Sequence, residues 1–158
     1  QDTDNGYIHP RAVTEKTVET MREDDPGKTV AHYMQPHGSF RLSEEAGHPW
    51  TKLQVGDRDL ETTWEYYRDN LEWVLEELKL LLNNVDAEKV VISADHGNSM
   101  GEYGFYGHRP YLQLEGMRRV PWIETSATDH GTYDPQTDTE TESPDTTREE
   151  MLAALGYR

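Results

Sequence analysis

Residues 89–108 read KVVISADHGNSMGEYGFYGH, and this stretch decides the predicted fold. It begins with the continuous apolar run Lys89 to Ala94, which has the length of a strand and is typical of a strand covered on both faces of a sheet. Asp95 and His96 follow directly. In open parallel sheets ligands bind beyond the carboxyl ends of the strands, so these two side chains are the first candidate site residues.

A second apolar run and a long helix precede this strand. Lys28 to Met34 lies between the breaker cluster Asp24 to Gly27 and Pro36, as a short buried strand should. From Leu60 to Leu82 apolar residues recur every three or four positions, which predicts an amphipathic helix. Strand, helix and strand in this order predict a right-handed crossover. We therefore expect an α/β fold, a mostly parallel sheet flanked by helices on both sides.

The remaining segments are shorter or irregular. Pro10 to Glu23 is expected to be a helix with proline in its first turn. Gln35 to Asp57 is expected to be an irregular excursion, and Arg119 to Ile123 a short edge strand. Residues 125–147 predict a mobile acidic loop, and Thr147 to Leu155 a terminal helix. Residues 1–158 are expected to form a single domain or a fragment of a longer one.

The charge of the chain excludes some functions. Acidic residues outnumber basic ones 31 to 15, giving a formal net charge of -16. A nucleic-acid partner is not expected, because the field of the molecule repels a polyanion. Arginine outnumbers lysine 10 to 5, and with the acidic excess this resembles proteins of salt-loving organisms; the alternative is an ordinary acidic protein. No apolar run is long enough to span a bilayer, so we expect a soluble protein, with the cytoplasm favoured.

Metal chemistry is one interpretation of the residues after the strand. Neighbouring side chains on a strand point to opposite faces, so Asp95 and His96 reach one ion only if the chain turns, and Gly97 supplies that freedom. A carboxylate beside an imidazole suits zinc or manganese, whereas calcium prefers oxygen alone. The alternative is an aspartate that caps a turn beside a surface histidine.

Three glycines at positions 101, 104 and 107 then lead to His108. Glycine costs folding entropy, so such a cluster favours a loop whose backbone approaches something closely. Glu102 is expected to be a cap, an acceptor that orients a histidine, or a solvated acid.

Another histidine follows the other apolar run. Met34 to His37 reads MQPH, and if both strands lie in one sheet their carboxyl ends share an edge. His37 can then face Asp95, His96 and His108. His32, inside the run, is expected to be a packed core residue.

The ordered combination of these motifs resembles the sulfatases and related members of the alkaline phosphatase superfamily. The resemblance is carried by the stretch from Val90 to Trp122, including DHGNSMGEYGFYGH and RRVPW, by MQPH at Met34 to His37, and by LAALGY at Leu152 to Tyr157. It is closest to the archaeal sulfatase-like proteins. It implies the C-terminal part of an α/β/α sandwich.

The resemblance also implies roles for single residues. Asp95 and His96 would be ligands of a divalent metal ion, either zinc, manganese or calcium. His37 would contact the sulfuryl or phosphoryl oxygens, and His108 would bind the same group or a second metal. Asn98 and Arg109 are weaker candidates for the rim.

Two departures from the family pattern limit this reading. Many sulfatases have asparagine where this chain has His96. The family's N-terminal aspartate ligands and its nucleophile motif have no counterpart, since there is no cysteine and Thr14 and Ser39 lack the right surroundings. We therefore expect a metal-dependent hydrolase of sulfate or phosphate esters that is present without its nucleophile-bearing N-terminal half and is inactive alone. The alternatives are a non-catalytic metal-binding or partner-docking module of the same fold, and an ordinary acidic α/β domain.

Overall fold

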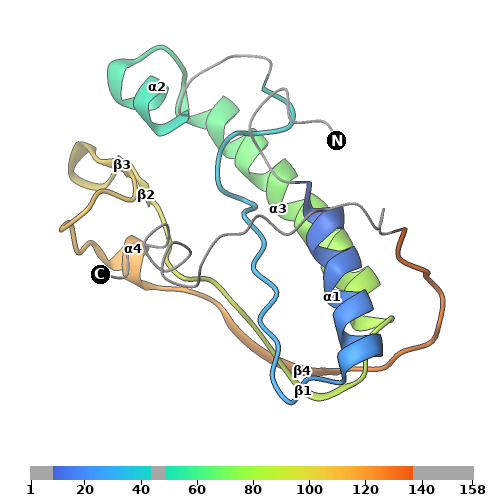
Figure 1. The fold of residues 1–158 in the computed structure, drawn as a ribbon. Coiled ribbons are helices and arrows are strands. Elements are labelled where there is room, and N and C mark those ends of the chain that lie inside the picture. Colours follow the sequence, from blue (N-terminus) through green and yellow to red (C-terminus); the bar gives the residue numbers. More distant parts are fainter. Residues whose placement is uncertain (1–8, 44–48, 137–158) are drawn as a thin grey trace, which may run out of the picture.

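The computed structural model describes residues 9–43 and 49–136. Helices come first along this part of the chain, and the strands of two small sheets follow with short helical turns between them (Figure 1). The elements are α1 (Pro10–Asp24), α2 (Pro49–Val55), α3 (Leu60–Leu82), β1 (Ala87–Ser93), β2 (Ser99–Met100), the 3-10 turn η1 (Glu102–Gly104), β3 (Tyr106–Gly107), α4 (Glu115–Arg118) and β4 (Trp122–Ala127). The predicted terminal helix and residues 137–147 of the predicted loop lie outside the described residues.

Helix α1 confirms the predicted first helix. Pro10 occupies its first position, where a missing N–H costs nothing, and the side chain of His9 accepts a hydrogen bond from the backbone N–H of Arg11. The helix ends where Asp25 adopts a left-handed conformation with φ 42°. The helix therefore ends at the cluster Asp24 to Gly27, as the sequence predicts.

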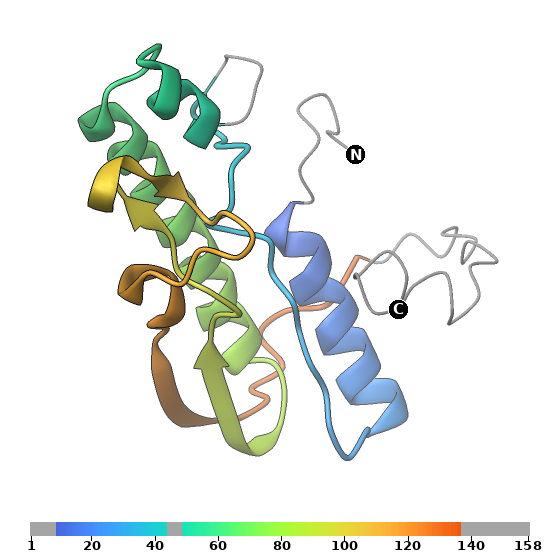
Figure 2. The same ribbon diagram turned by 90° about the vertical axis from the view of Figure 1, so that its left-hand side faces the viewer.

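Helix α3 also confirms its prediction, with bounds at Leu60 and Leu82. Asp59 caps the helix, and its carboxylate accepts the backbone N–H of Thr62 at 2.8 Å. Helices α1 and α3 lie side by side (Figures 1 and 2). Arg11 on α1 donates two hydrogen bonds to the buried carboxylate of Glu77 on α3.

The prediction of a mostly parallel sheet is wrong for the described residues. Strand β1 confirms the predicted apolar strand, but it pairs with β4 in an antiparallel ladder that places Ile92 opposite Ile123. The second sheet joins β2 and β3, also antiparallel. No residue of β1 is fully buried and Val91 is 38% exposed, so the prediction of a strand covered on both faces is also wrong. The apolar run of β1 does not specify the partner strand or its direction, and β4 supplies the partner.

The predicted strand at residues 28–34 is also wrong. This segment is extended but belongs to neither sheet. Ala31 and Tyr33 pack against a core cluster, while Val30, His32 and Met34 are exposed. The prediction that His32 is a core residue is therefore wrong, because the alternation of the segment turns it outward.

Other segments differ from their predictions in part. Residues 35–57, predicted to be irregular, contain the short helix α2. The predicted edge strand at Arg119 to Ile123 is shifted, since β4 begins at Trp122 just after Pro121 and extends to Ala127. The predicted loop at 125–147 therefore begins inside a strand.

Two groups of side chains form the core. Val18, Leu81, Val85 and Ala127 bring together α1, the end of α3 and β4. Phe40, Trp50 and Tyr67 form a second, aromatic group between α2 and α3, with ring centroids 6.0–6.4 Å apart. None of the described helices is long and apolar enough to cross a membrane.

Candidate functional site

The loop after β1 packs closely against α4. The backbone N–H of Gly97 donates to the carbonyl of Met117 at 2.8 Å. A Cβ on Gly97 would lie 2.1 Å from the carbonyl oxygen of Gly116, a distance that real side chains do not show. Residue 97 must be glycine because two backbone segments approach each other here. This close approach is a structural reason for the glycine that follows Asp95 and His96.

The glycine-rich loop is a small, internally bonded hairpin. Glu102 accepts hydrogen bonds from the hydroxyl of Ser99 and from the backbone N–H of Met100, both at 2.6 Å. The Ser99 hydroxyl bond is the main cause that lowers the pKa of Glu102. Of the three predicted roles Glu102 has that of a cap. Gly107 has φ 76°, and a Cβ there would lie 2.6 Å from the ring of Trp50, so the close approach is to an aromatic ring.

Three of the four candidate side chains lie together. The ring centroids of His96 and His108 are 4.2 Å apart, and those of His37 and His108 are 5.6 Å apart. His37 follows the extended segment, His96 follows β1, and His108 follows β3. Three segments distant in sequence thus gather three imidazoles, all of them half-buried.

Nearby polar groups fix two of these rings. His108 Nδ1 lies 3.0 Å from Asn98 Oδ1, and His96 Nδ1 lies 2.9 Å from the carbonyl oxygen of Gly97. Asp95 accepts the backbone N–H of His96 at 2.9 Å, and its other carboxylate oxygen is 3.8 Å from His96 Nε2. The Asp95 side chain is 70% exposed. Asp95 therefore caps a turn, as the alternative to a metal ligand predicts, and it lies beside the histidines.

These residues do not fit a metal ion by themselves. Within residues 9–43 and 49–136 no group of three or more histidine, aspartate or glutamate side chains is arranged to hold one. The rings of His96 and His108 are tilted at 37° to each other.

The predicted rim residues lie on either side of the histidines. Asn98 contacts His108 as described, and Arg109 donates to the side-chain oxygen of Gln54 on α2 at 3.1 Å. The guanidinium of Arg109 also makes a cation–π contact, with its Cζ 5.6 Å from the ring centroid of Phe105. The Arg109 side chain thus brings one positive charge close to the loop in a protein of net charge -16.

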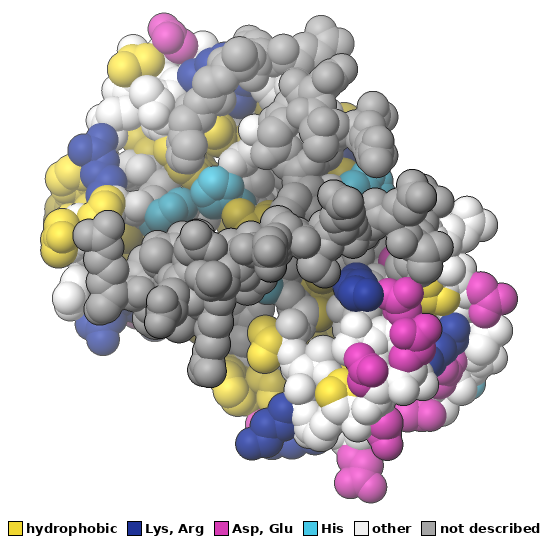
Figure 3. All heavy atoms as spheres, viewed as in Figure 1, with side chains coloured by type: hydrophobic (Ala, Val, Ile, Leu, Met, Phe, Trp, Pro, Cys, Tyr) yellow, Lys and Arg dark blue, Asp and Glu magenta, His cyan; other side chains and the backbone are white. Residues whose placement is uncertain are grey.

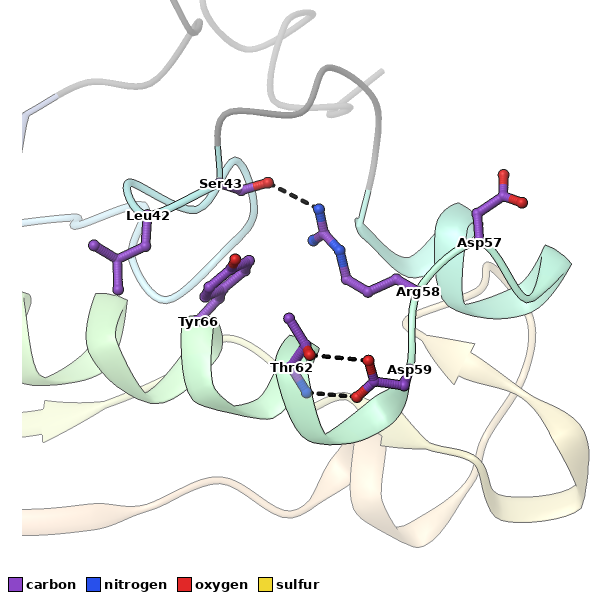
Figure 4. Close-up of a pocket in the computed structure, with 7 residues that line it drawn as sticks. All are labelled: Leu42, Ser43, Asp57, Arg58, Asp59, Thr62 and Tyr66. Atoms are coloured by element: carbon purple, nitrogen blue, oxygen red, sulfur yellow. Dashed lines mark hydrogen bonds between the residues drawn. The ribbon is translucent and has the colours of Figure 1, made fainter.

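Figure 3 shows histidine side chains at the surface beside hydrophobic ones, while most acidic side chains in this view gather around α1. A polar pocket lies elsewhere, at the N-terminal end of α3 (Figure 4). It is lined by Leu42, Ser43, Asp57, Arg58, Asp59, Thr62 and Tyr66. It contains none of the predicted site residues, and its dashed contacts are the helix cap and a bond from Arg58 to Ser43.

Sequence reasoning missed the residue that positions His37. Asn70 on α3 is 1% exposed, and its amide donates to the carbonyl of Ser39 at 3.2 Å and to that of His37 at 3.4 Å. Its side-chain oxygen accepts the backbone N–H of Arg41 at 3.1 Å. The available signal was an asparagine among the inward-facing positions of an amphipathic helix, because an amide is buried only when its hydrogen bonds are made.

No protein family matches this chain, and neither a curated protein nor a solved structure was found to be similar to it.

Proposed function

We propose that this chain supplies the oxyanion-binding histidines of a hydrolase acting on sulfate or phosphate esters. His37, His96 and His108 would hold the ester oxygens, and the nucleophile would come from residues outside the described part of the chain. The observation that carries the proposal is the gathering of the three imidazoles from three separate segments.

The chemical setting supports this role. Acidic side chains outnumber basic ones in the whole protein, so a site for an anionic ester needs local donors. The nearby guanidinium of Arg109 is such a donor. The Nδ1–H groups of His96 and His108 already donate to the carbonyl oxygen of Gly97 and to Asn98 Oδ1, so the Nε2 atoms of these rings donate to an ester oxygen in the imidazolium form. Donors that are fixed in advance stabilise charge on ester oxygens without reorganisation. The bonds to Asn98 and to the carbonyl of Gly97 fix two of the rings.

Two of the described hydroxyl groups are excluded as the nucleophile because they are buried and hydrogen-bonded. Thr14 is fully buried, and its hydroxyl lies 2.9 Å from that of Tyr33. Ser99 is fully buried and donates to Glu102. Neither can attack an ester bound at the histidines.

A divalent metal ion, whether zinc, manganese or calcium, would need ligands beyond Asp95 and His96. The described residues do not complete its shell, so we assign no step to it. The same observation favours the second candidate, a non-catalytic module that binds a partner rather than a substrate.

Activity assays separate the two candidates. Aryl sulfate, aryl phosphate and bis-aryl phosphate are offered to the 158-residue chain and to a longer product of the same gene. We expect no turnover by the chain alone and turnover by the longer product. His37→Ala and His108→Ala in the longer product should each lower kcat by about a hundredfold, the usual cost of losing one oxyanion donor.

His130→Ala is the matched control, because this exposed histidine lies after β4, away from the cluster. It should leave turnover unchanged. Turnover by the 158-residue chain alone would refute the missing nucleophile, and full activity of both cluster variants would refute the role of the histidines.

A further inference from the structure

The loop that carries His37 rests on the first turn of α2. Gly38 follows His37, and a Cβ on this glycine would lie 2.3 Å from Cγ of the buried Pro49. Phe40 lies further along the same loop, and its ring meets that of Trp50 edge-on, with the two centroids 6.3 Å apart. The backbone and one side chain of this loop therefore both contact the start of α2.

The loop that carries His108 rests on the same tryptophan. Gly107 precedes His108, and a Cβ on this glycine would lie 2.6 Å from Cγ and 2.8 Å from Cδ1 of Trp50. Further along α2, the side-chain amide of Gln54 donates to the carbonyl of Gly104 at 3.2 Å. Both views place α2 beside the β2–β3 hairpin (Figures 1 and 2). Helix α2 therefore joins two histidine loops that are distant in sequence.

A third contact fixes Trp50 to the long helix. Its ring centroid lies 6.0 Å from that of Tyr67 on α3, and Trp50 is 5% exposed. Buried side chains pack as closely as small molecules in a crystal, so a shift of one is passed on to its neighbours. The size of the Trp50 ring therefore sets how closely the two loops approach each other. The rings of His37 and His108, which these loops carry, have centroids 5.6 Å apart.

The residue type at position 50 is informative. The Nε1–H of Trp50 is buried, and no residue in the described part of the chain accepts a hydrogen bond from it. A buried N–H without an acceptor destabilises a fold. Phenylalanine would fill a core without that cost, so core filling alone does not explain the indole. Its size does, because the larger ring reaches both histidine loops.

We propose that Trp50 is a positioning residue that sets the spacing of His37 and His108, so that both imidazoles reach one bound anion. Trp50 acts through Phe40 and Gly107 and does not itself contact the anion. This role rests on the proposed anion site, because the spacing matters only if the two rings share a ligand. Small displacements of positioned groups cost large factors in activity.

The test compares Trp50→Phe with Leu81→Ala in the 158-residue chain. The two variants remove the same number of side-chain heavy atoms, but Leu81 belongs to the other core cluster, with Val18 and Val85. Inorganic phosphate is titrated in molar sodium chloride at constant pH, and the imidazole resonances are followed by NMR. Urea unfolding measures whether each variant is folded.

The wild-type chain should show His37, His96 and His108 on one binding curve. Trp50→Phe should weaken phosphate binding about tenfold or more, the usual cost of losing one hydrogen bond to a charged group. In this variant the His37 resonances should no longer follow those of His108. Leu81→Ala should keep the wild-type affinity and the single curve.

Replacement of Trp50 by benzothienylalanine separates ring shape from hydrogen bonding. This amino acid has the ring shape of tryptophan, with sulfur in place of the N–H group. Positioning by shape predicts that this variant binds phosphate as tightly as the wild type. The comparison stays decisive if Trp50→Phe does not fold, because the isosteric ring preserves the packing.

The outcomes distinguish this role from the proposed function. No shift of the clustered histidines in the wild-type chain would overturn the anion site itself. With wild-type binding observed, unchanged affinity in Trp50→Phe, or an equal loss in Leu81→Ala, would overturn the role of Trp50 alone. A benzothienylalanine variant that loses as much affinity as Trp50→Phe would assign the effect to the N–H group and overturn positioning by shape.

Discussion

Substitution of Arg11 by alanine should destabilise the fold by breaking the contact between α1 and α3. Arg11 Nε and Nη2 donate to the two carboxylate oxygens of Glu77 at 2.7 and 2.9 Å. The Glu77 side chain is 5% exposed, and that of Arg11 is 41% exposed. The variant therefore leaves a buried carboxylate without its cation.

The magnitude follows from how deeply the pair is buried. Removing one partner of a fully buried ion pair costs about 3–5 kcal/mol. Arg11 is more than a third exposed, so water can reach part of the gap and screen the remaining charge. We expect a loss of about 2 kcal/mol in the free energy of unfolding. Arg68→Ala is the control, because the Arg68–Glu72 pair is 3.9 Å apart and both side chains are more than half exposed. It should cost less than about 0.5 kcal/mol.

Urea unfolding followed by tryptophan fluorescence in molar salt measures both variants. The double variant Arg11→Met with Glu77→Leu should recover most of the loss, because apolar side chains of similar size remove the buried charge altogether. Equal losses for Arg11→Ala and Arg68→Ala would refute the reasoning.

Three further predictions concern charge and loop geometry. The thermal midpoint should rise from dilute to molar salt, because screening removes repulsion within a chain of charge -16; an unchanged midpoint in a salt series would exclude this. Arg22 holds the pKa of Asp129 below its usual value, so the stability from this pair is complete above about pH 4 and is lost as the pH falls through the folded pKa. Acid titrations of unfolding should therefore be less steep for Asp129→Asn, and an identical slope would count against the pair. Gly107→Ala should lower the free energy of unfolding by about 2–4 kcal/mol, because φ at this position is positive and the added Cβ would meet Trp50. Gly27→Ala is the control, and it should leave stability unchanged or raise it by up to about 1 kcal/mol. Similar urea midpoints for the two variants would contradict this.

The helices could be predicted from the sequence because their signals are local. The bounds of α3 follow from apolar residues at helical spacing and from the capping carboxylate of Asp59. Strand β1 follows from Val90, Val91 and Ile92 in sequence. Each of these signals lies within the element that it specifies.

Strand pairing could not be predicted in the same way. The apolar run of β1 does not encode whether its partner is the segment at residues 28–34 or β4, because pairing depends on contacts distant in sequence. The alternation in residues 28–34 was also ambiguous. Val30 and Met34 on one face and Ala31 and Tyr33 on the other are all apolar or aromatic, so the sequence did not reveal which face turns inward.

The sequence predicted that the histidines lie close together, but the reason for this prediction was only partly right. The sequence placed them at the edge of one parallel sheet, and the described residues contain no such sheet. Instead Asn70 holds the loop of His37, the contact of Gly97 with α4 holds His96, and the short β2–β3 hairpin positions His108. Of the three glycines that suggested a ligand loop, Gly107 is required by its close approach to Trp50, and Gly101 and Gly104 have positive φ angles of 116° and 76°.

Titration with inorganic phosphate tests whether the three clustered histidines bind an anionic ester group. Imidazole resonances are followed by NMR in molar sodium chloride at constant pH, so that long-range repulsion is screened. The resonances of His37, His96 and His108 should shift together along one saturable curve, while those of His130 should not. Shifts of equal size in His130, or no shift in the three clustered histidines, would contradict it.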